Sequence, residues 1–278
     1  MKPDWLKIKI DVTGDYLKVK KIVKDKKLQT ICSSAKCPNI YKCWSMGTAT
    51  FMILGDICTR DCKFCATHTG KPLTPDIDEP QRVADSIKIM QLKHCVVTSV
   101  DRDDLDDKGA THWANTITTI RETNPHTIIE VLTPDFDDID EYLQKVFDTK
   151  PDIFGHNIET VRRLTPLVRS RAKYDVSLSV LKKARAFGLV TKSGLMVGLG
   201  ETTDEVIDTL RDLRTAGCQM LTIGQYLQPT KENIAVKEYI TPEQFERYKN
   251  TALELGFDSV ESAPLVRSSF MAERSFHA

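Results

Sequence analysis

The sequence predicts an α/β fold, a partial (β/α)6 TIM-type barrel made of six strand–helix units. The prediction rests on short apolar strands that alternate with amphipathic helices from residue 48 onward. Consecutive units of this kind imply parallel strands joined by right-handed crossovers. Six units are too few to close an eight-fold barrel, so we expect a three-quarter barrel with its site at the carboxyl ends of the strands. A doubly wound open sheet is the alternative.

Each unit of the predicted barrel can be placed on the chain. Strands are expected at 50–55, 95–100, 127–132, 152–156, 193–198 and 220–225. Helices are expected near 80–92, 111–123, 138–147, 175–187, 203–216 and 242–255. Thr202 and Glu205 have the spacing of a capping box, and Thr241 precedes a proline at the first position of the last helix. Three glycines fit helix stops: Gly188, Gly217 and Gly256.

The alternation does not extend over the whole chain. The sequence has 278 residues, room for one large domain with a sizeable core. We expect an N-terminal extension over 1–47, the barrel over 48–256 and a C-terminal extension over 257–278. Both extensions are expected to pack on the barrel.

Composition excludes several classes of protein. Lys and Arg number 39, as do Asp and Glu, so no overall charge favours nucleic acid or a membrane surface. Hydrophobic residues make up 41%, typical of a globular chain. No stretch reaches the ~18 apolar residues of a membrane span, and the N-terminus lacks the apolar core of a secretory signal. We therefore expect a cytoplasmic protein whose eight cysteines are metal ligands or reactive thiols rather than disulfides.

Six of the eight cysteines form two triplets within 34 positions. Cys32, Cys37 and Cys43 read C-x4-C-x5-C, whereas Cys58, Cys62 and Cys65 read C-x3-C-x2-C. Zinc sites usually close with four ligands, and His68 could complete a Cys3His site with the second triplet. The remaining cysteines stand alone on apolar stretches and are expected in the core: Cys95 and Cys218.

A four-iron cluster is the second interpretation of the triplets. Three thiolates bind three irons, and the fourth iron stays open to another ligand. The C-x3-C-x2-C spacing with an aromatic residue, Phe64, before the last cysteine resembles the radical SAM superfamily. That resemblance implies that the open iron binds S-adenosylmethionine (SAM).

Several residues at strand ends are candidates for SAM contacts. Residues 194–201 read G-x-M-x-G-x-x-E around Gly198 and match the superfamily's adenine element, although a plain turn explains them equally well. Asn157 and Glu159 end the fourth strand and could bind a ribose, or could be buried caps. Three further candidates are chosen by position: Thr98, Arg169 and Gln225. The acidic run 101–107 lacks the glycine and terminal Glu of a calcium loop and is expected to be a solvated loop.

The chain from about Leu28 to Phe270 resembles the lipoyl synthase family. The resemblance rests on both cysteine triplets together and on residues 49–56, 97–104, 194–201, 221–229 and 266–269. It implies that Cys58, Cys62 and Cys65 bind one 4Fe–4S cluster, the one that cleaves SAM. It also implies that Cys32, Cys37, Cys43 and Ser269 bind a second, auxiliary 4Fe–4S cluster. The family has Tyr where this chain has Phe270.

The same resemblance implies an activity and partners. The family inserts two sulfur atoms at carbons 6 and 8 of an octanoyl chain on a lysine of a lipoyl carrier domain, and the auxiliary cluster is the sulfur donor. An electron-donor protein is then a second partner, and we expect a monomer. Residues 1–30 hold nine Lys and four Asp and could attract an acidic carrier. Another radical SAM sulfur-inserting enzyme, and a structural zinc protein, are the alternatives.

Overall fold

The structure is a computed structural model that describes residues 2–8, 12, 14–270 and 272. It divides into two compact units. The N-terminal unit comprises Lys9–Asp61 and Ala66–Ile153, and the C-terminal unit comprises Met1–Ile8, Cys62–Cys65 and Phe154–Ala278. No helix among the described residues has the length and apolar character required to cross a membrane.

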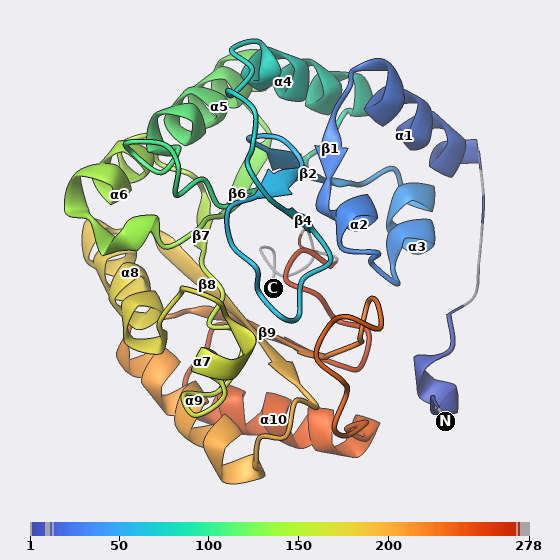
Figure 1. Cartoon of the computed structure of the whole chain (residues 1–278), viewed down its shortest axis with the longest axis vertical. Coiled ribbons are helices and arrows are strands. Elements are labelled where there is room, and N and C mark those ends of the chain that lie inside the picture. The colour runs from blue at the N-terminus through green and yellow to red at the C-terminus, as the bar shows by residue number, and fades with distance from the viewer. Residues whose placement is uncertain (1, 9–11, 13, 271, 273–278) are drawn as a thin grey trace. The chain divides into compact units, whose positions relative to one another are not determined.

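Four strands of the main sheet belong to the N-terminal unit, in the order β1-β2-β5-β6. β1 (Gln29–Thr30) is antiparallel to β2 (Thr50–Ile53), whereas β2, β5 (His94–Ser99) and β6 (Ile128–Leu132) are parallel, with Phe51 beside Val97 and Val97 beside Val131. α4 (Glu79–Met90), α5 (Ala110–Thr123) and α6 (Asp140–Phe147) lie outside these strands (Figure 1). The parallel strands are buried throughout, as expected where helices cover a sheet.

The C-terminal unit continues the strand–helix pattern. β7 (Ile153–Gly155) begins at the boundary between the units, and β8 (Val190–Val197), β9 (Met220–Gln225) and β10 (Ser259–Ser262) follow in that order. β8, β9 and β10 are parallel, with Leu195 beside Ile223. The helices of this unit lie outside its strands (Figure 1); they are α7 (Thr165–Val168), α8 (Tyr174–Phe187), α9 (Thr203–Thr215) and α10 (Pro242–Glu254).

The six predicted strands and six predicted helices are all present, with boundaries shifted by a few residues. The capping box of α9 is formed, since Thr202 accepts from the Glu205 amide and Glu205 accepts from the Thr202 amide. Thr241 caps α10 by accepting from the Gln244 amide, and Gly188 ends α8 with φ +102°. β10 is an additional strand that the sequence pattern did not predict.

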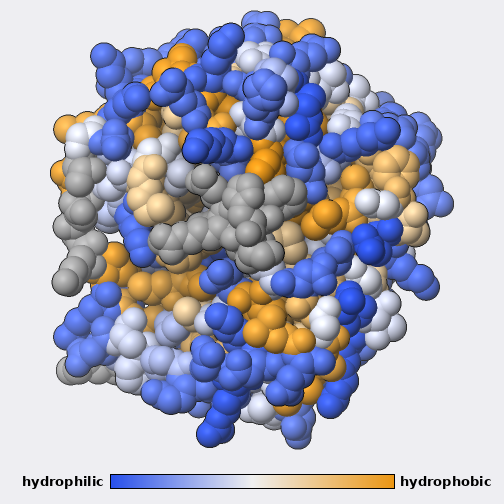
Figure 2. Space-filling view, turned by 180° about the vertical axis from the view of Figure 1, so that it is seen from behind, coloured by the Kyte–Doolittle hydropathy of each residue, from blue (hydrophilic) through white to orange (hydrophobic). Residues whose placement is uncertain are grey.

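The chain before β2 is more ordered than the sequence suggested. It contains η1 (Asp4–Leu6), α1 (Gly14–Asp25), α2 (Ile31–Ser34) and α3 (Ile40–Ser45). Within the N-terminal unit, Val19, Cys32, Trp44 and Ala49 form a separate small core. Figure 2 shows hydrophilic side chains over much of one face, with smaller hydrophobic areas between them, which agrees with the balanced composition.

Candidate functional site

Cys58 lies at the end of a two-residue strand in the N-terminal unit. β3 (Ile57–Cys58) pairs with β4 (His68–Thr69), and Cys58 is buried. Its sulfur accepts from the backbone amides of Arg60 and Asp101, at 3.4 Å each, and lies 3.8 Å from the Asp101 carboxylate. Two backbone amides therefore fix the position of this sulfur, and metal binding requires its thiolate form.

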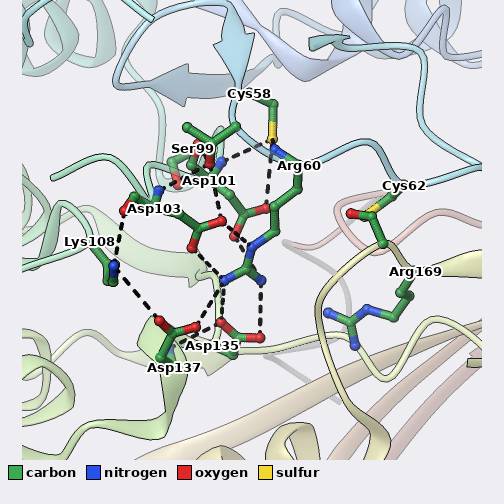
Figure 3. A network of polar contacts seen from close by, with 12 residues as sticks. Cys58, Arg60, Cys62, Ser99, Asp101, Asp103, Lys108, Asp135, Asp137 and Arg169 are labelled. Carbon is green, nitrogen blue, oxygen red and sulfur yellow. Dashed lines mark hydrogen bonds and ion pairs between the residues drawn. The ribbon is translucent and has the colours of Figure 1, made fainter. Parts of the chain in front are cut away.

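The side chain of Arg60 is surrounded by four carboxylates of the N-terminal unit (Figure 3). It is bidentate to Asp103, with both distances 2.9 Å, and bidentate to Asp135, at 2.8 and 3.0 Å. Asp101 lies at 3.2 Å and Asp137 at 3.5 Å. Burial alone would lower the pKa of the guanidinium, but the hydrogen bonds with Asp103 and the charges on Asp101 and Asp135 raise it above its usual range.

The turn that carries Cys62 and Cys65 is held by backbone contacts within the C-terminal unit. The Cys65 amide donates to the Cys62 carbonyl at 3.0 Å, and the Lys63 amide donates to the Val168 carbonyl at 2.8 Å. Asn233 donates from its side-chain amide to the Cys65 carbonyl at 2.8 Å. Phe64 packs against the core of this unit. The turn is therefore fixed, and both thiols are only partly buried.

Cys32 on α2, Cys37 in the turn between the helices and Cys43 on α3 are neighbours. The Cys37 amide donates to the Cys32 carbonyl at 3.0 Å, which closes the turn after α2. Burial, and the neighbouring Cys32 and Cys37, raise the pKa of the Cys43 thiol to about 12, while Lys42 opposes the shift. Burial also raises the pKa of the Cys32 thiol. Three such thiols repel one another as thiolates, whereas iron bound between them would reverse that repulsion. The donor set therefore fits an iron–sulfur cluster.

All eight cysteines are free thiols. Among the described residues, no three His, Cys, Asp or Glu side chains meet around a point that one metal ion could occupy. His68, the possible fourth zinc ligand, is exposed on β4.

Asn157, Glu159 and Arg169 lie together after β7 in the C-terminal unit. The Asn157 amide donates to the Glu159 carboxylate at 3.1 Å, and Arg169 donates to the Asn157 carbonyl at 3.3 Å. Burial raises the pKa of the Glu159 carboxyl, and Arg169 and Asn157 oppose that shift. Arg169 also donates to the Ser177 hydroxyl at 2.8 Å. The structure therefore brings three of the candidate SAM contacts into one polar cluster.

Gly198 and Gln225 are also neighbours, and a side chain at position 198 would collide with Gln225. Gly198 has φ +95°, and a Cβ there would lie 2.1 Å from Gln225 Nε2 and 2.5 Å from the Glu238 carbonyl oxygen. Gln225 donates to the carbonyls of Tyr226 and Glu238 and accepts from the Ile240 amide. These bonds order the segment after β9. Their role is structural, and SAM contacts by Gln225 and Gly198 stay a prediction.

Thr98 and Ser269 have different surroundings. Thr98 is buried on β5 and donates to the Leu132 carbonyl at 2.9 Å. Its hydroxyl therefore links β5 to the neighbouring strand β6. Ser269 is partly buried in the turn closed by the bond from the Phe270 amide to the Arg267 carbonyl, at 2.9 Å.

Ser268, the neighbour of Ser269, has a partner that the sequence did not reveal. Its hydroxyl accepts from Asn157 Nδ2 at 2.7 Å. A Cβ on Gly194 would lie 2.7 Å from both Ser268 Oγ and Asn157 Oδ1, so this glycine makes the contact possible. The bond fixes the C-terminal segment at a candidate SAM residue.

The acidic run 101–107 differs from the expected solvated loop. Arg102 within it is 2% exposed and pairs with Asp104, while Asp101 and Asp103 face Arg60. Arg60 and Asp135 are not among the residues that the sequence predicts for the site. Both lie close in sequence to features that are predicted, the second triplet and the end of the third predicted strand.

Solved structures with a similar fold include SuiB of Streptococcus suis bound to S-adenosylmethionine, with TM-score 0.63 and 11% identity, covering 82% of this chain and 55% of that one. Methylornithine synthase (PylB) has TM-score 0.53 and 14% identity, covering 91% and 84%. Such identities show the fold alone. The family model described as the radical SAM superfamily matches residues 52–213. The chain is thus a radical SAM protein, and the predicted partial β/α barrel is confirmed.

Curated relatives define the family more narrowly. The lipoyl synthase of Parabacteroides distasonis is 59% identical over 273 residues, which cover 98% of this chain and 97% of that protein. The lipoyl synthase of Flavobacterium psychrophilum is 55% identical over 274 residues, covering 98% and 94%. The chain belongs to the lipoyl synthase family, as its motifs predicted, and the predicted enzyme class, a radical SAM sulfurtransferase, is confirmed with it.

Proposed function

We propose that this protein inserts sulfur at carbons 6 and 8 of an octanoyl chain carried on a lysine of a lipoyl carrier domain. The observation that carries the proposal is that Cys32, Cys37 and Cys43 are neighbours in the segment from α2 to α3, in a family member that also has the C-x3-C-x2-C segment. A radical SAM protein that only cleaved SAM would need one triplet. The additional triplet, Cys32, Cys37 and Cys43, supports a second cluster, which serves as the sulfur-donating substrate.

The target carbons explain why radical chemistry is required. Carbons 6 and 8 have no neighbouring carbonyl group to acidify their hydrogens, so a general base is ineffective there. When bound, the cluster of the second triplet together with SAM supplies a carbon radical strong enough to remove such hydrogens. The protein contributes by holding the reactants in place and excluding water.

Each set of residues has a proposed task. Cys58, Cys62 and Cys65 hold the SAM-cleaving cluster, and the backbone amides of Arg60 and Asp101 donate to the Cys58 sulfur. Asn157, Glu159 and Arg169 bind and orient SAM from their shared polar cluster. Ser269 is the fourth ligand of the auxiliary cluster. Its alkoxide is a hard donor among soft thiolates and leaves readily on protonation, which lets the cluster release sulfur.

The proposed activity is tested by product analysis. Protein purified without oxygen is expected to be brown and to contain roughly eight irons, two four-iron clusters. Reaction with SAM, a reductant and an octanoylated carrier peptide is expected to yield a peptide heavier by two sulfur atoms less the hydrogens replaced, measured by mass spectrometry. Colourless protein with stoichiometric zinc would contradict the proposal, and so would an unchanged octanoyl peptide from fully loaded protein.

A groove beside the first triplet suits an acidic carrier domain. It encloses about 510 Å³ and is lined by α1, β1, α2 and α3. Lys20, Lys24 and Lys27 are exposed at this groove, and none of them pairs with a described acidic side chain. Val23 and Ile40 supply apolar lining. We propose that an acidic face of the carrier docks here, and that a separate electron-donor protein supplies the electrons.

Reversing the charge of this groove is expected to slow the reaction with carrier protein. Replacing Lys20, Lys24 and Lys27 by Glu should lower kcat/KM about 10-fold or more at low salt, because charge complementarity mainly raises the encounter rate. Turnover of a short octanoylated peptide should change little. The matched control replaces Lys88, Lys93 and Lys150, exposed lysines before β5 and β7, by Glu. Equal effects of the two triple variants would contradict carrier docking at this groove.

A further inference from the structure

Trp44 has a buried hydrogen-bond donor without an acceptor. The side chain lies on α3, and the residue is 4% exposed. Its indole nitrogen Nε1 is buried and forms no well-aligned hydrogen bond with any described residue. Trp113, a second buried tryptophan, shows the usual arrangement, since its Nε1 donates to the Ser99 hydroxyl at 3.2 Å. A buried donor without an acceptor destabilises the fold, so the unsatisfied N–H of Trp44 requires an explanation.

The surroundings of Trp44 supply a candidate acceptor. Trp44 and Cys32 belong to the same small core of the N-terminal unit, and Cys43 packs against that core. Tyr16 covers Trp44, with 5.5 Å between ring centroids. Burial raises the pKa of the Cys32 thiol, and the Trp44 N–H is among the groups that lower it. The indole of Trp44 and the sulfur of Cys32, a predicted cluster ligand, are therefore neighbours in this core.

The charge on that sulfur decides whether a hydrogen bond forms. A neutral thiol is a weak acceptor, and with the thiol protonated the N–H remains unsatisfied. A thiolate carries a full negative charge, and hydrogen bonds to charged acceptors are roughly twice as strong as neutral ones. Metal binding requires the thiolate. The Trp44 N–H thus gains a strong acceptor when Cys32 binds iron as a thiolate.

We propose that Trp44 is a positioning residue of the auxiliary cluster, donating its indole N–H to Cys32 Sγ in the cluster-bound protein. The inference rests on the proposed function, because it needs a cluster on the first triplet. Hydrogen bonds to cluster sulfurs withdraw negative charge and raise the reduction potential. They also hold the ligand in one orientation, as outer partners of metal ligands do. Trp44 therefore stabilises the reduced cluster and slows the loss of its iron.

The test isolates the auxiliary cluster. In a Cys58→Ala, Cys62→Ala, Cys65→Ala background, the full chain should keep roughly four irons. Adding Trp44→Phe is expected to shift the cluster's reduction potential to a more negative value, measured by potentiometric titration followed by EPR. Loss of iron to a chelator should become about 10-fold faster, the usual effect of removing an outer partner of a ligand.

Two further variants separate the hydrogen bond from packing. Replacing Trp44 by 3-benzothienylalanine keeps the bicyclic shape and removes the N–H, and it should reproduce both shifts even if the Phe variant folds poorly. Tyr16→Phe keeps the indole N–H beside an altered neighbour and should leave the potential unchanged. Wild-type behaviour of the benzothienyl variant would overturn the role of Trp44. Failure of the triple-alanine background to bind iron would instead overturn the proposed auxiliary cluster.

Discussion

Replacing Cys43 by alanine is expected to abolish sulfur insertion while SAM is still cleaved under reducing conditions. Cys43 is one of three neighbouring thiols in the segment from α2 to α3, and an alanine leaves two. Removing even an outer partner of a ligand costs roughly 10- to 100-fold in metal affinity or activity, so loss of a ligand should lower product yield by more than about 100-fold. Iron content should fall from roughly eight to roughly four per chain. Iron analysis, 5′-deoxyadenosine release and peptide mass spectrometry measure the three effects.

The chain offers a matched control for this variant. Cys218 is also buried, and its thiol contacts the carbonyls of Thr191 and Met220 rather than other thiols. Cys218→Ala should keep both the iron content and the product yield, with a modest loss of stability from the small cavity. Normal sulfur insertion by the Cys43→Ala variant would show that the first triplet does not hold the sulfur source.

The fold could be predicted where its signals are local. A capping box needs only Thr202 and Glu205, three positions apart, and the apolar strands are visible as runs because helices cover their sheet. β10 was missed because Ser259–Ser262 reads as a polar tetrapeptide, and pairing with β9 alone makes it a strand. The short helices before β2 were missed because four to six residues show no period, and the small core around Trp44 orders them.

The cysteines of the site could be predicted from the sequence, but the charged residues that pair around Cys58 could not. Cysteine spacing is a sequence property, so both triplets could be recognised directly. Arg60 is separated from Asp103 by 43 residues and from Asp135 by 75, and nothing in the sequence pairs them. The run 101–107 appeared solvated because its charges are dense, whereas burial against a cation makes Asp103 part of the structure. Long-range pairing of charges needs the fold.

Replacing Arg60 by methionine should be the most destabilising single substitution among those considered. The side chain is 4% exposed and satisfies Asp103 and Asp135, themselves 11% and 3% exposed, with four hydrogen bonds. Methionine fills much of the volume but leaves buried carboxylates without a cation. Breaking a buried ion pair in this way costs about 3–5 kcal/mol in the free energy of unfolding. Urea unfolding followed by circular dichroism measures the change.

The Arg60→Met substitution should also weaken iron binding by the second triplet. Arg60 follows Cys58 by two positions and its amide donates to that sulfur, so displacement of the residue removes one of the two amide donors at the Cys58 sulfur. The variant is expected to lose iron from the second triplet before the first, seen as a lower rate of SAM cleavage. Arg60→Lys is the control. Lysine keeps the positive charge but lacks the planar guanidinium that donates to Asp103 and Asp135 at the same time. The lysine variant should therefore recover only part of the stability. Equal stability of the methionine variant and the wild type would show that the four carboxylates do not depend on Arg60.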